Sequence, residues 1–231
     1  MMTCIGGDAK AMIVRLGKAI FGLICLGVLA LTLREVWPSM RSDSPGWLAG
    51  LFGQQRTLSG AKIGIIAGHK GFDSGAVCPD GLTEESVNLW VAERVVTGLE
   101  TRGAKVLLLD EYDIRLDGFH ADALVSIHTD SCEVDLTGFK VAGSEMGPPQ
   151  SDALADCLWE AYAHATGLTR NADTITEDMR SYHAFRRVSE NTPAAIIEIG
   201  FLATDGRLLR RSPERPASGI IAALECFLNS K

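Results

Sequence analysis

The body of the chain alternates short apolar runs with stretches of helical period, and this alternation restricts the possible folds most. Apolar runs bounded by turn residues predict strands, and apolar positions that recur every three to four residues predict helices. Strands separated by helices imply a largely parallel sheet. We therefore predict an α/β fold, a three-layer body whose sheet is covered by helices on both faces. Strands are expected at 62–67, 104–109, 123–127, 138–141 and 194–199, and helices at 84–102, 152–166 and 216–228.

Capping residues mark where two of these helices begin and end. Thr83 is a plausible N-cap for the first helix, and Gly103 follows its last turn. Ser151 and Gly167 bracket the second helix in the same way. Small polar side chains accept hydrogen bonds from free N–H groups at helix starts, and glycine tolerates the left-handed conformation that ends many helices.

The N-terminus resembles an export signal. An unbroken apolar run from Ala19 to Leu33 follows Lys10, Arg15 and Lys18. We favour an uncleaved membrane anchor over a cleavable signal peptide because the run continues past Ala30. Either alternative places the body outside the cytoplasm. The domain prediction is residues 1–34 as anchor or signal peptide, 35–58 as linker and 59–231 as catalytic domain.

The net charge and the cysteines indicate which kinds of partner and which redox compartment are compatible with this sequence. The formal net charge of −7 argues against nucleic acid as a partner, because no basic field is available. No two of the six cysteines have CxxC spacing, so a cysteine zinc site is not indicated. Cys78 and Cys132 could form a disulfide in an oxidising compartment; free thiols are the alternative.

Polar side chains stand where several predicted strands end. His69 follows the first strand, His128 follows the third, and Glu198 lies near the end of the last. Glu84 opens the helix after the first strand, where Glu85 is equally eligible. Ligands bind at the carboxyl ends of strands in such sheets. We therefore expect these groups to converge at one edge.

This set of residues is typical of a zinc hydrolase. Catalytic Zn²⁺ commonly takes three ligands from histidine and carboxylate and leaves one position for water. A further carboxylate can take the proton of that water and pass it to a leaving nitrogen. Glu198 interrupts an apolar run, where a buried carboxylate is costly unless paired or functional. Asp73 is interpreted as a turn residue rather than a ligand, and His183 as a residue outside the cleft.

Four segments resemble one known family. AGHKGFDSGA, GLTEESVNLWVAERV, LVSIHTDS and PAAIIEIGFLATD occur in the order found in type-3 N-acetylmuramoyl-L-alanine amidases. The resemblance implies that His69, Glu84 and His128 bind Zn²⁺ and that Glu198 is catalytic. Glu84 is preferred over Glu85 because Asn88 and Leu89 then fit the family spacing. Several loop residues depart from the family pattern, among them Lys70, but no ligand is lost.

The expected function follows from this resemblance. It implies a zinc-dependent hydrolase that cuts the amide between N-acetylmuramic acid and L-alanine of the peptidoglycan stem peptide. The alternatives are a zinc peptidase acting on stem-peptide bonds and a non-catalytic peptidoglycan-binding module. Peptidoglycan is the expected partner, and the expected location is extracytoplasmic, on the membrane through the N-terminal segment.

Overall fold

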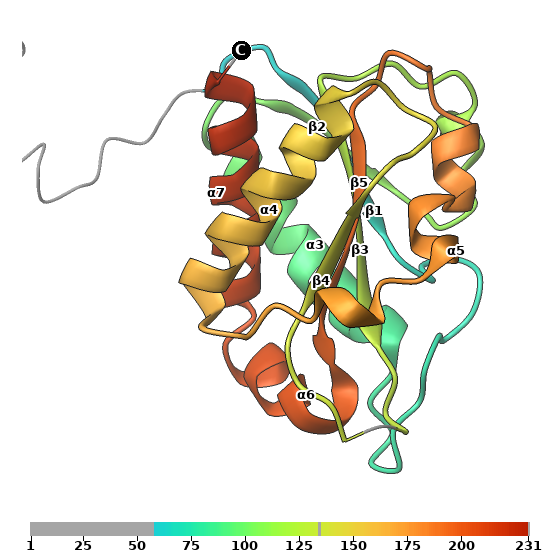
Figure 1. Ribbon diagram of the computed structural model, residues 1–231, viewed down its shortest axis with the longest axis vertical. Coiled ribbons are helices and arrows are strands. Elements are labelled where there is room, and N and C mark those ends of the chain that lie inside the picture. Colours follow the sequence, from blue (N-terminus) through green and yellow to red (C-terminus); the bar gives the residue numbers. More distant parts are fainter. Residues whose placement is uncertain (1–57, 134, 231) are drawn as a thin grey trace, which may run out of the picture. The chain divides into compact units, whose positions relative to one another are not determined.

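Five strands form one sheet in the order β2-β1-β3-β5-β4. The computed structural model describes residues 58–133 and 135–230, and Figure 1 shows its helices packed against the sheet. The strands are β1 (Lys62–Ala67), β2 (Lys105–Leu109), β3 (Ala123–Asp130), β4 (Lys140–Gly143) and β5 (Ala194–Phe201). The helices are α3 (Glu84–Glu100), α4 (Gln150–Thr166), α5 (Glu177–Arg180), α6 (Leu202–Arg211) and α7 (Glu214–Asn229), with short 3₁₀ helices η2 (Ile114–Leu116), η3 (Ala172–Thr174) and η4 (His183–Arg186).

The sheet is mixed rather than wholly parallel. Its pairings β1–β2, β1–β3 and β3–β5 are parallel, and the edge strand β4 runs antiparallel to β5. The prediction of a sheet with helices packed on it is confirmed in this form. The carboxyl ends of β1, β3 and β5 consequently lie at one edge.

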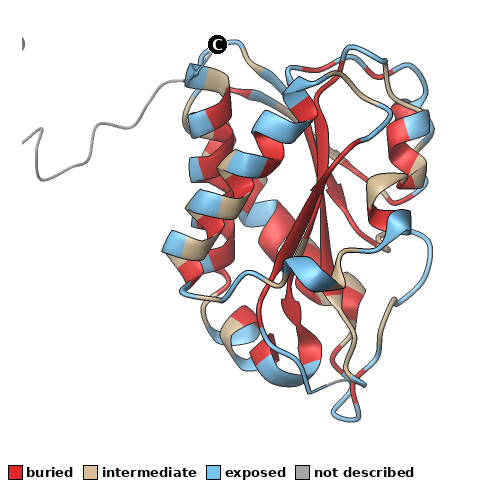
Figure 2. Ribbon diagram, in the orientation of Figure 1, coloured by how far each residue is buried: buried red, intermediate tan, exposed pale blue. Residues whose placement is uncertain are grey.

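The two faces of the sheet are covered differently. Ile63, Val125 and Ile197 belong to the larger core cluster, together with residues of α3, α4 and α7. Ile66 and Ile196, whose side chains point to the opposite face of the sheet, belong to a second cluster with residues of η2, α5 and η4. In Figure 2 the red, buried sides of the long helices turn toward the sheet. Helices therefore lie on both faces as predicted. Those on the second face are single turns, and loops cover most of the rest of that face.

Two of the predicted helix ends are confirmed and one is wrong. The Thr83 side chain accepts a hydrogen bond from the Ser86 N–H (3.2 Å), and Gly167 takes the left-handed conformation with φ 74°. Ser151 does not cap α4, which begins after Pro149. Its Oγ instead accepts from the Ala194 N–H (3.1 Å), so this hydroxyl holds the start of β5 rather than a helix end.

In the described part of the chain, two disulfides join distant segments. Cys78 and Cys132, for which the sequence left a disulfide and free thiols as alternatives, form a bridge with Cα atoms 5.4 Å apart. A second bridge, which we did not predict, joins Cys157 of α4 to Cys226 of α7 across 6.0 Å between Cα atoms. The first ties the loop before α3 to the loop after β3. The second fastens two helices that already pack together.

The predicted N-terminal anchor, residues 1–34, and all of the predicted linker except Leu58 lie outside the described residues. Within the part of the chain that the structure describes, no helix has the length and apolar character needed to cross a membrane.

Candidate metal centre and active site

Three side chains meet at the carboxyl edge of the sheet. One potential ligand atom from each of His69, Glu84 and His128 lies within 4.8 Å of the others. Glu84 Oε1 is 3.1 Å from His69 Nε2 and 3.2 Å from His128 Nδ1. The first helical turn of α3 thus places a carboxylate oxygen between two imidazoles that come from different strand ends.

Glycines make room for this approach. A Cβ on Gly68 would lie 2.4 to 2.6 Å from the ring atoms of His128. A Cβ on Gly75, where φ is 60°, would lie 2.6 Å from Glu84 Oε2. Such distances are shorter than real carbon contacts, so the loop after β1 needs glycine at both positions.

His69 itself has a rare backbone conformation. Its φ of 67° is the only positive value at a non-glycine residue in the described part of the chain. That conformation costs about 1 kcal/mol or more for a residue with a Cβ. His69 Nδ1 lies 2.5 Å from Asp73 Oδ1, and the same oxygen accepts from the Gly75 N–H (2.9 Å). Asp73 therefore shapes the turn, as predicted, and also orients the His69 ring.

The three groups shift one another's pKa values toward their charged forms. Burial alone would raise the pKa of Glu84, but hydrogen bonds from His128 and His69 hold it well below its usual range. The hydrogen bond to Glu84 raises the pKa of His69 to about 9, against burial, which lowers it. Burial likewise lowers the pKa of His128, but the surrounding carboxylates give a net rise. The ionised Glu84 carboxylate thus favours the protonated form of both neighbouring rings when no metal is bound.

Glu198 lies beside this group on the neighbouring strand. It is the register partner of His128 in the β3–β5 pairing. Its Oε2 atom is buried and has no hydrogen-bond partner among the described residues. Burial raises the pKa of Glu198 to about 7, with His128 opposing the rise and Glu84 adding to it. An orphaned carboxylate oxygen next to a histidine is a group available for proton transfer.

Glu111, which we did not predict, and His183, which we predicted to lie outside the cleft, both lie beside the metal centre. Glu111 is 5% exposed, and its Oε1 accepts from the Tyr182 hydroxyl (2.7 Å) and lies 2.8 Å from His183 Nε2. Burial would raise the pKa of Glu111, but these contacts and the charge of His128 lower it to about 2. Glu111 follows β2 by two residues, so the rule that predicted the other site residues would have found it. Tyr182 and His183 come from an irregular segment with no such signal.

The residues at the edge fit a zinc ion by their chemistry. Two imidazole nitrogens and one carboxylate oxygen form the mixed donor set typical of catalytic zinc. The free acceptor on Glu198 fits the further carboxylate that such sites use in proton transfer.

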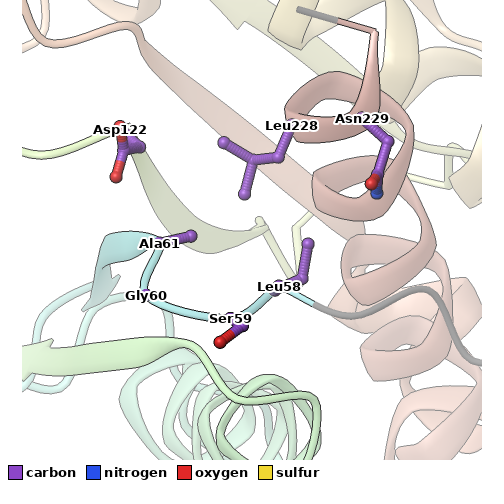
Figure 3. A pocket seen from close by; sticks show the side chains of 7 residues that line it. All are labelled: Leu58, Ser59, Gly60, Ala61, Asp122, Leu228 and Asn229. Atoms are coloured by element: carbon purple, nitrogen blue, oxygen red, sulfur yellow. The ribbon is translucent and has the colours of Figure 1, made fainter.

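A separate hollow of about 320 Å³ lies at the other edge of the sheet. Ala61 and Asp122, which line it, directly precede β1 and β3. It is therefore at the amino ends of the strands whose carboxyl ends carry His69 and His128. Figure 3 shows its lining residues, Leu58, Ser59, Gly60, Ala61, Asp122, Leu228 and Asn229.

Several known proteins are similar to this chain in fold or sequence. The family model for N-acetylmuramoyl-L-alanine amidase matches residues 63–225. The catalytic domain of CwlV, an N-acetylmuramoyl-L-alanine amidase from Bacillus (Paenibacillus) polymyxa var. colistinus, is 26% identical with a TM-score of 0.57, covering 74% of this chain and 99% of that one. The N-acetylmuramoyl-L-alanine amidase from Clostridium difficile 630 has a TM-score of 0.64 at 22% identity, covering 75% and 99%, a likeness of fold.

A curated relative matches over a shorter segment. The uncharacterized protein YqiI of Bacillus subtilis (strain 168) is 37% identical over 90 residues, which cover 35% of this chain and 43% of that protein. The match thus spans less than half of that relative. The family match, in contrast, spans most of the chain and contains all four residues of the predicted site. The chain belongs to the type-3 family of N-acetylmuramoyl-L-alanine amidases.

Proposed function

We propose that this protein is a zinc-dependent hydrolase that cleaves the amide between N-acetylmuramic acid and L-alanine of the peptidoglycan stem peptide. The observation that carries the proposal is the meeting of His69, Glu84 and His128, with Glu198 as the register partner of His128. Membership of the amidase family supports the bond class.

In this proposal, His69 Nε2, His128 Nδ1 and a Glu84 oxygen would hold the ion. These are the atoms that face one another at 3.1 and 3.2 Å. When bound, Zn²⁺ supplies Lewis-acid activation of the scissile carbonyl and of a water molecule. Asp73 keeps His69 Nδ1 engaged, so Nε2 is the nitrogen of this ring that would be free to bind the ion.

Glu198 moves the proton. Its buried oxygen has no competing partner among the described residues, so it can accept a proton from the attacking water. It then donates that proton to the departing nitrogen, because an amine anion is a poor leaving group. A pKa raised by burial suits both halves of this exchange, since an acid-base group works best when its pKa is near the working pH.

The proposed location is outside the cytoplasm, with the N-terminal segment as a membrane anchor. The two disulfides support an oxidising compartment. The basic start and apolar run of residues 10–33 support export. Peptidoglycan, the proposed substrate, occupies the same compartment.

A digest of purified peptidoglycan by the zinc-loaded full chain tests the proposal. Mass spectrometry should find intact stem peptides with a free L-alanine amine, and glycan strands without peptides. The Glu198→Gln chain, carrying the same zinc, serves as control and should release neither product. Shortened stem peptides would favour the zinc peptidase alternative. Binding of sacculi without any product would favour the non-catalytic module.

A further inference from the structure

Glu111 lies where it can hold two residues of the metal centre at once. Its carboxylate is buried at the start of the turn that follows β2. Oε2 accepts a hydrogen bond from the His69 N–H (2.8 Å) and lies 3.5 Å from His128 Nε2. The two proposed histidine ligands therefore share one carboxylate oxygen behind them.

The contact to His69 acts on the backbone. His69 has a φ of 67°, a conformation that other residues with a Cβ in the described chain avoid. A charge-assisted hydrogen bond to the N–H at this position offsets part of the conformational cost. Glu111 thereby helps to keep the His69 backbone in the left-handed conformation, which places the His69 ring next to Glu84.

The contact to His128 sets which ring nitrogen carries the proton. Tyr182 has one hydroxyl hydrogen, and its shortest contact is with Glu111 Oε1 (2.7 Å). The Tyr182 oxygen is then an acceptor, and it lies 3.3 Å from His128 Nε2. Because the Tyr182 oxygen can accept on that side and the Glu111 carboxylate lies 3.5 Å away, a neutral His128 ring would carry its hydrogen on Nε2. The lone pair of that neutral ring would then be on Nδ1, which faces Glu84 at 3.2 Å.

Other side chains hold Glu111 in turn. His183 Nε2 lies 2.8 Å from Oε1, and the His183 ring stacks on Tyr112 with centroids 4.2 Å apart. Tyr182 packs edge-on against the His128 ring at 5.5 Å. The carboxylate is thus fixed by a tyrosine, a histidine and a backbone N–H.

We propose that Glu111 is a positioning residue of the metal centre, which fixes the backbone of His69 and commits His128 to bind the metal through Nδ1. This inference rests on the proposed function, because it assumes that the histidines hold a metal. The role of Glu111 toward His128 is comparable to that of Asp73 toward His69. Each histidine has one ring nitrogen that faces Glu84, and its other ring nitrogen faces an outer partner, which is Asp73 for His69 and Glu111 with Tyr182 for His128. Metal-binding histidines commonly have such outer partners, whose loss weakens metal binding about 10- to 100-fold.

Metal binding by the Glu111→Gln full chain tests the inference. Glutamine keeps the size of the side chain and removes its charge. We expect the Kd for Zn²⁺, measured by chelator competition, to rise about 10- to 100-fold, and the absorption spectrum of the Co²⁺-loaded protein to change. Asp110→Asn is the matched control, because this neighbouring carboxylate pairs with Lys70 instead. A Glu111→Gln chain with the Zn²⁺ affinity and Co²⁺ spectrum of the wild type would overturn the inference.

A measurement on the unaltered chain keeps the inference testable if the variant does not fold. Nitrogen NMR of the Zn²⁺-loaded protein should show His128 bound through Nδ1 with a hydrogen on Nε2. Coordination of His128 through Nε2 would overturn the inference and leave the proposed function standing. A wild-type chain that binds no Zn²⁺ would instead contradict the proposed function itself.

Discussion

His128 and Glu198 are aligned partners in the parallel pairing of β3 and β5. Side chains at aligned positions of neighbouring strands project from the same face of a sheet. The sheet register thus sets the distance between a proposed metal ligand and the proposed proton carrier, without help from a loop.

Glu198→Gln should remove turnover and keep the metal. The amide cannot accept the proton of the attacking water, so we expect kcat to fall by about 10²- to 10⁴-fold. The Zn²⁺ affinity of the variant should stay within about threefold of the wild-type value, because the metal ligands are assigned to other residues. Loss of a residue that hydrogen-bonds a metal ligand typically weakens metal binding by about 10- to 100-fold. Steady-state kinetics and chelator competition measure the two effects. Glu214→Gln, on α7, is the control, and turnover by Glu198→Gln at the control rate would contradict the role of Glu198.

The pH dependence of the stability of the metal-free protein should reveal the raised pKa of Glu198. Burial raises the pKa of Glu198 from 4.5 to about 7, so between these values the folded chain holds a proton that the unfolded chain has released. Stability from this group is therefore present below pH 4.5 and is lost as the pH rises toward and past 7.

The comparison of Glu198→Gln with wild type isolates this contribution from other titrating groups. We expect the Tm of the variant, relative to that of the wild type, to increase between pH 5 and pH 8 in the presence of chelator. Thermal unfolding followed by circular dichroism gives the difference at each pH. A constant Tm difference across that range would mean that Glu198 has an ordinary pKa.

Glu84 and Glu85 provide a matched pair of carboxylates at the start of α3. Glu84 Oε1 contacts both histidines, whereas no contact joins Glu85 to them. Glu84→Gln should weaken Zn²⁺ binding by more than the 10- to 100-fold typical of an outer partner. Glu85→Gln should leave it near wild type. Equilibrium dialysis with metal analysis compares them, and the reverse order of effects would transfer the ligand role to Glu85.

The sequence predicts the parts of the fold that depend on hydrophobic periodicity. The strand predicted at 62–67 has those limits in the structure, and Val87, Val91 and Leu99 are buried as the helical spacing of α3 requires. β3 extends three residues beyond its predicted end, to Asp130, because His128 and Thr129 stay in the sheet. Polar residues at the end of an apolar run hide such an extension.

Tertiary contacts decide the features that we did not predict. α6 begins directly after β5, with Leu202 and Leu209 buried, and its sequence is too polar overall to stand out. The bridge between Cys157 and Cys226 depends on α4 lying beside α7, which spacing along the chain does not reveal. Glu111 depends on contacts with Tyr182 and His183, about 70 residues away in sequence. Of the site, the strand-end positions were predictable, Glu111 among them, whereas Tyr182 and His183 were not, because they come from an irregular segment.

Gly68→Ala should disturb the metal centre through packing alone. The added methyl would meet the His128 ring at 2.4 to 2.6 Å, so the ring must move. We expect weaker Zn²⁺ binding and a stability loss of about 1–3 kcal/mol, as for other overpacked sites. Gly206→Ala is the control, because its methyl would meet Leu82 at an ordinary 3.5 Å. Zn²⁺ affinity of Gly68→Ala equal to that of the control would show that the ring has other room.

The two disulfides should differ in what they protect. Cys78 lies six residues before Glu84, and Cys132 lies four residues after His128, so their bridge connects two ligand-bearing segments. Cys157 and Cys226 connect α4 to α7, which pack on the sheet face opposite to the side chains of His128 and Glu198. Removal of either bridge should cost about 2–5 kcal/mol of stability.

Only removal of the bridge between Cys78 and Cys132 should also weaken Zn²⁺ binding. We expect the Cys78→Ser/Cys132→Ser chain to bind Zn²⁺ more weakly than the Cys157→Ser/Cys226→Ser chain, at a temperature where both are folded. Calorimetric titration with Zn²⁺ and thermal unfolding, run on both chains, separate affinity from stability. Equal affinities would mean that the loop before α3 keeps Glu84 and His69 in place without the covalent link, through contacts such as the hydrogen bond from the Ala76 N–H to Glu84 Oε2 (3.1 Å).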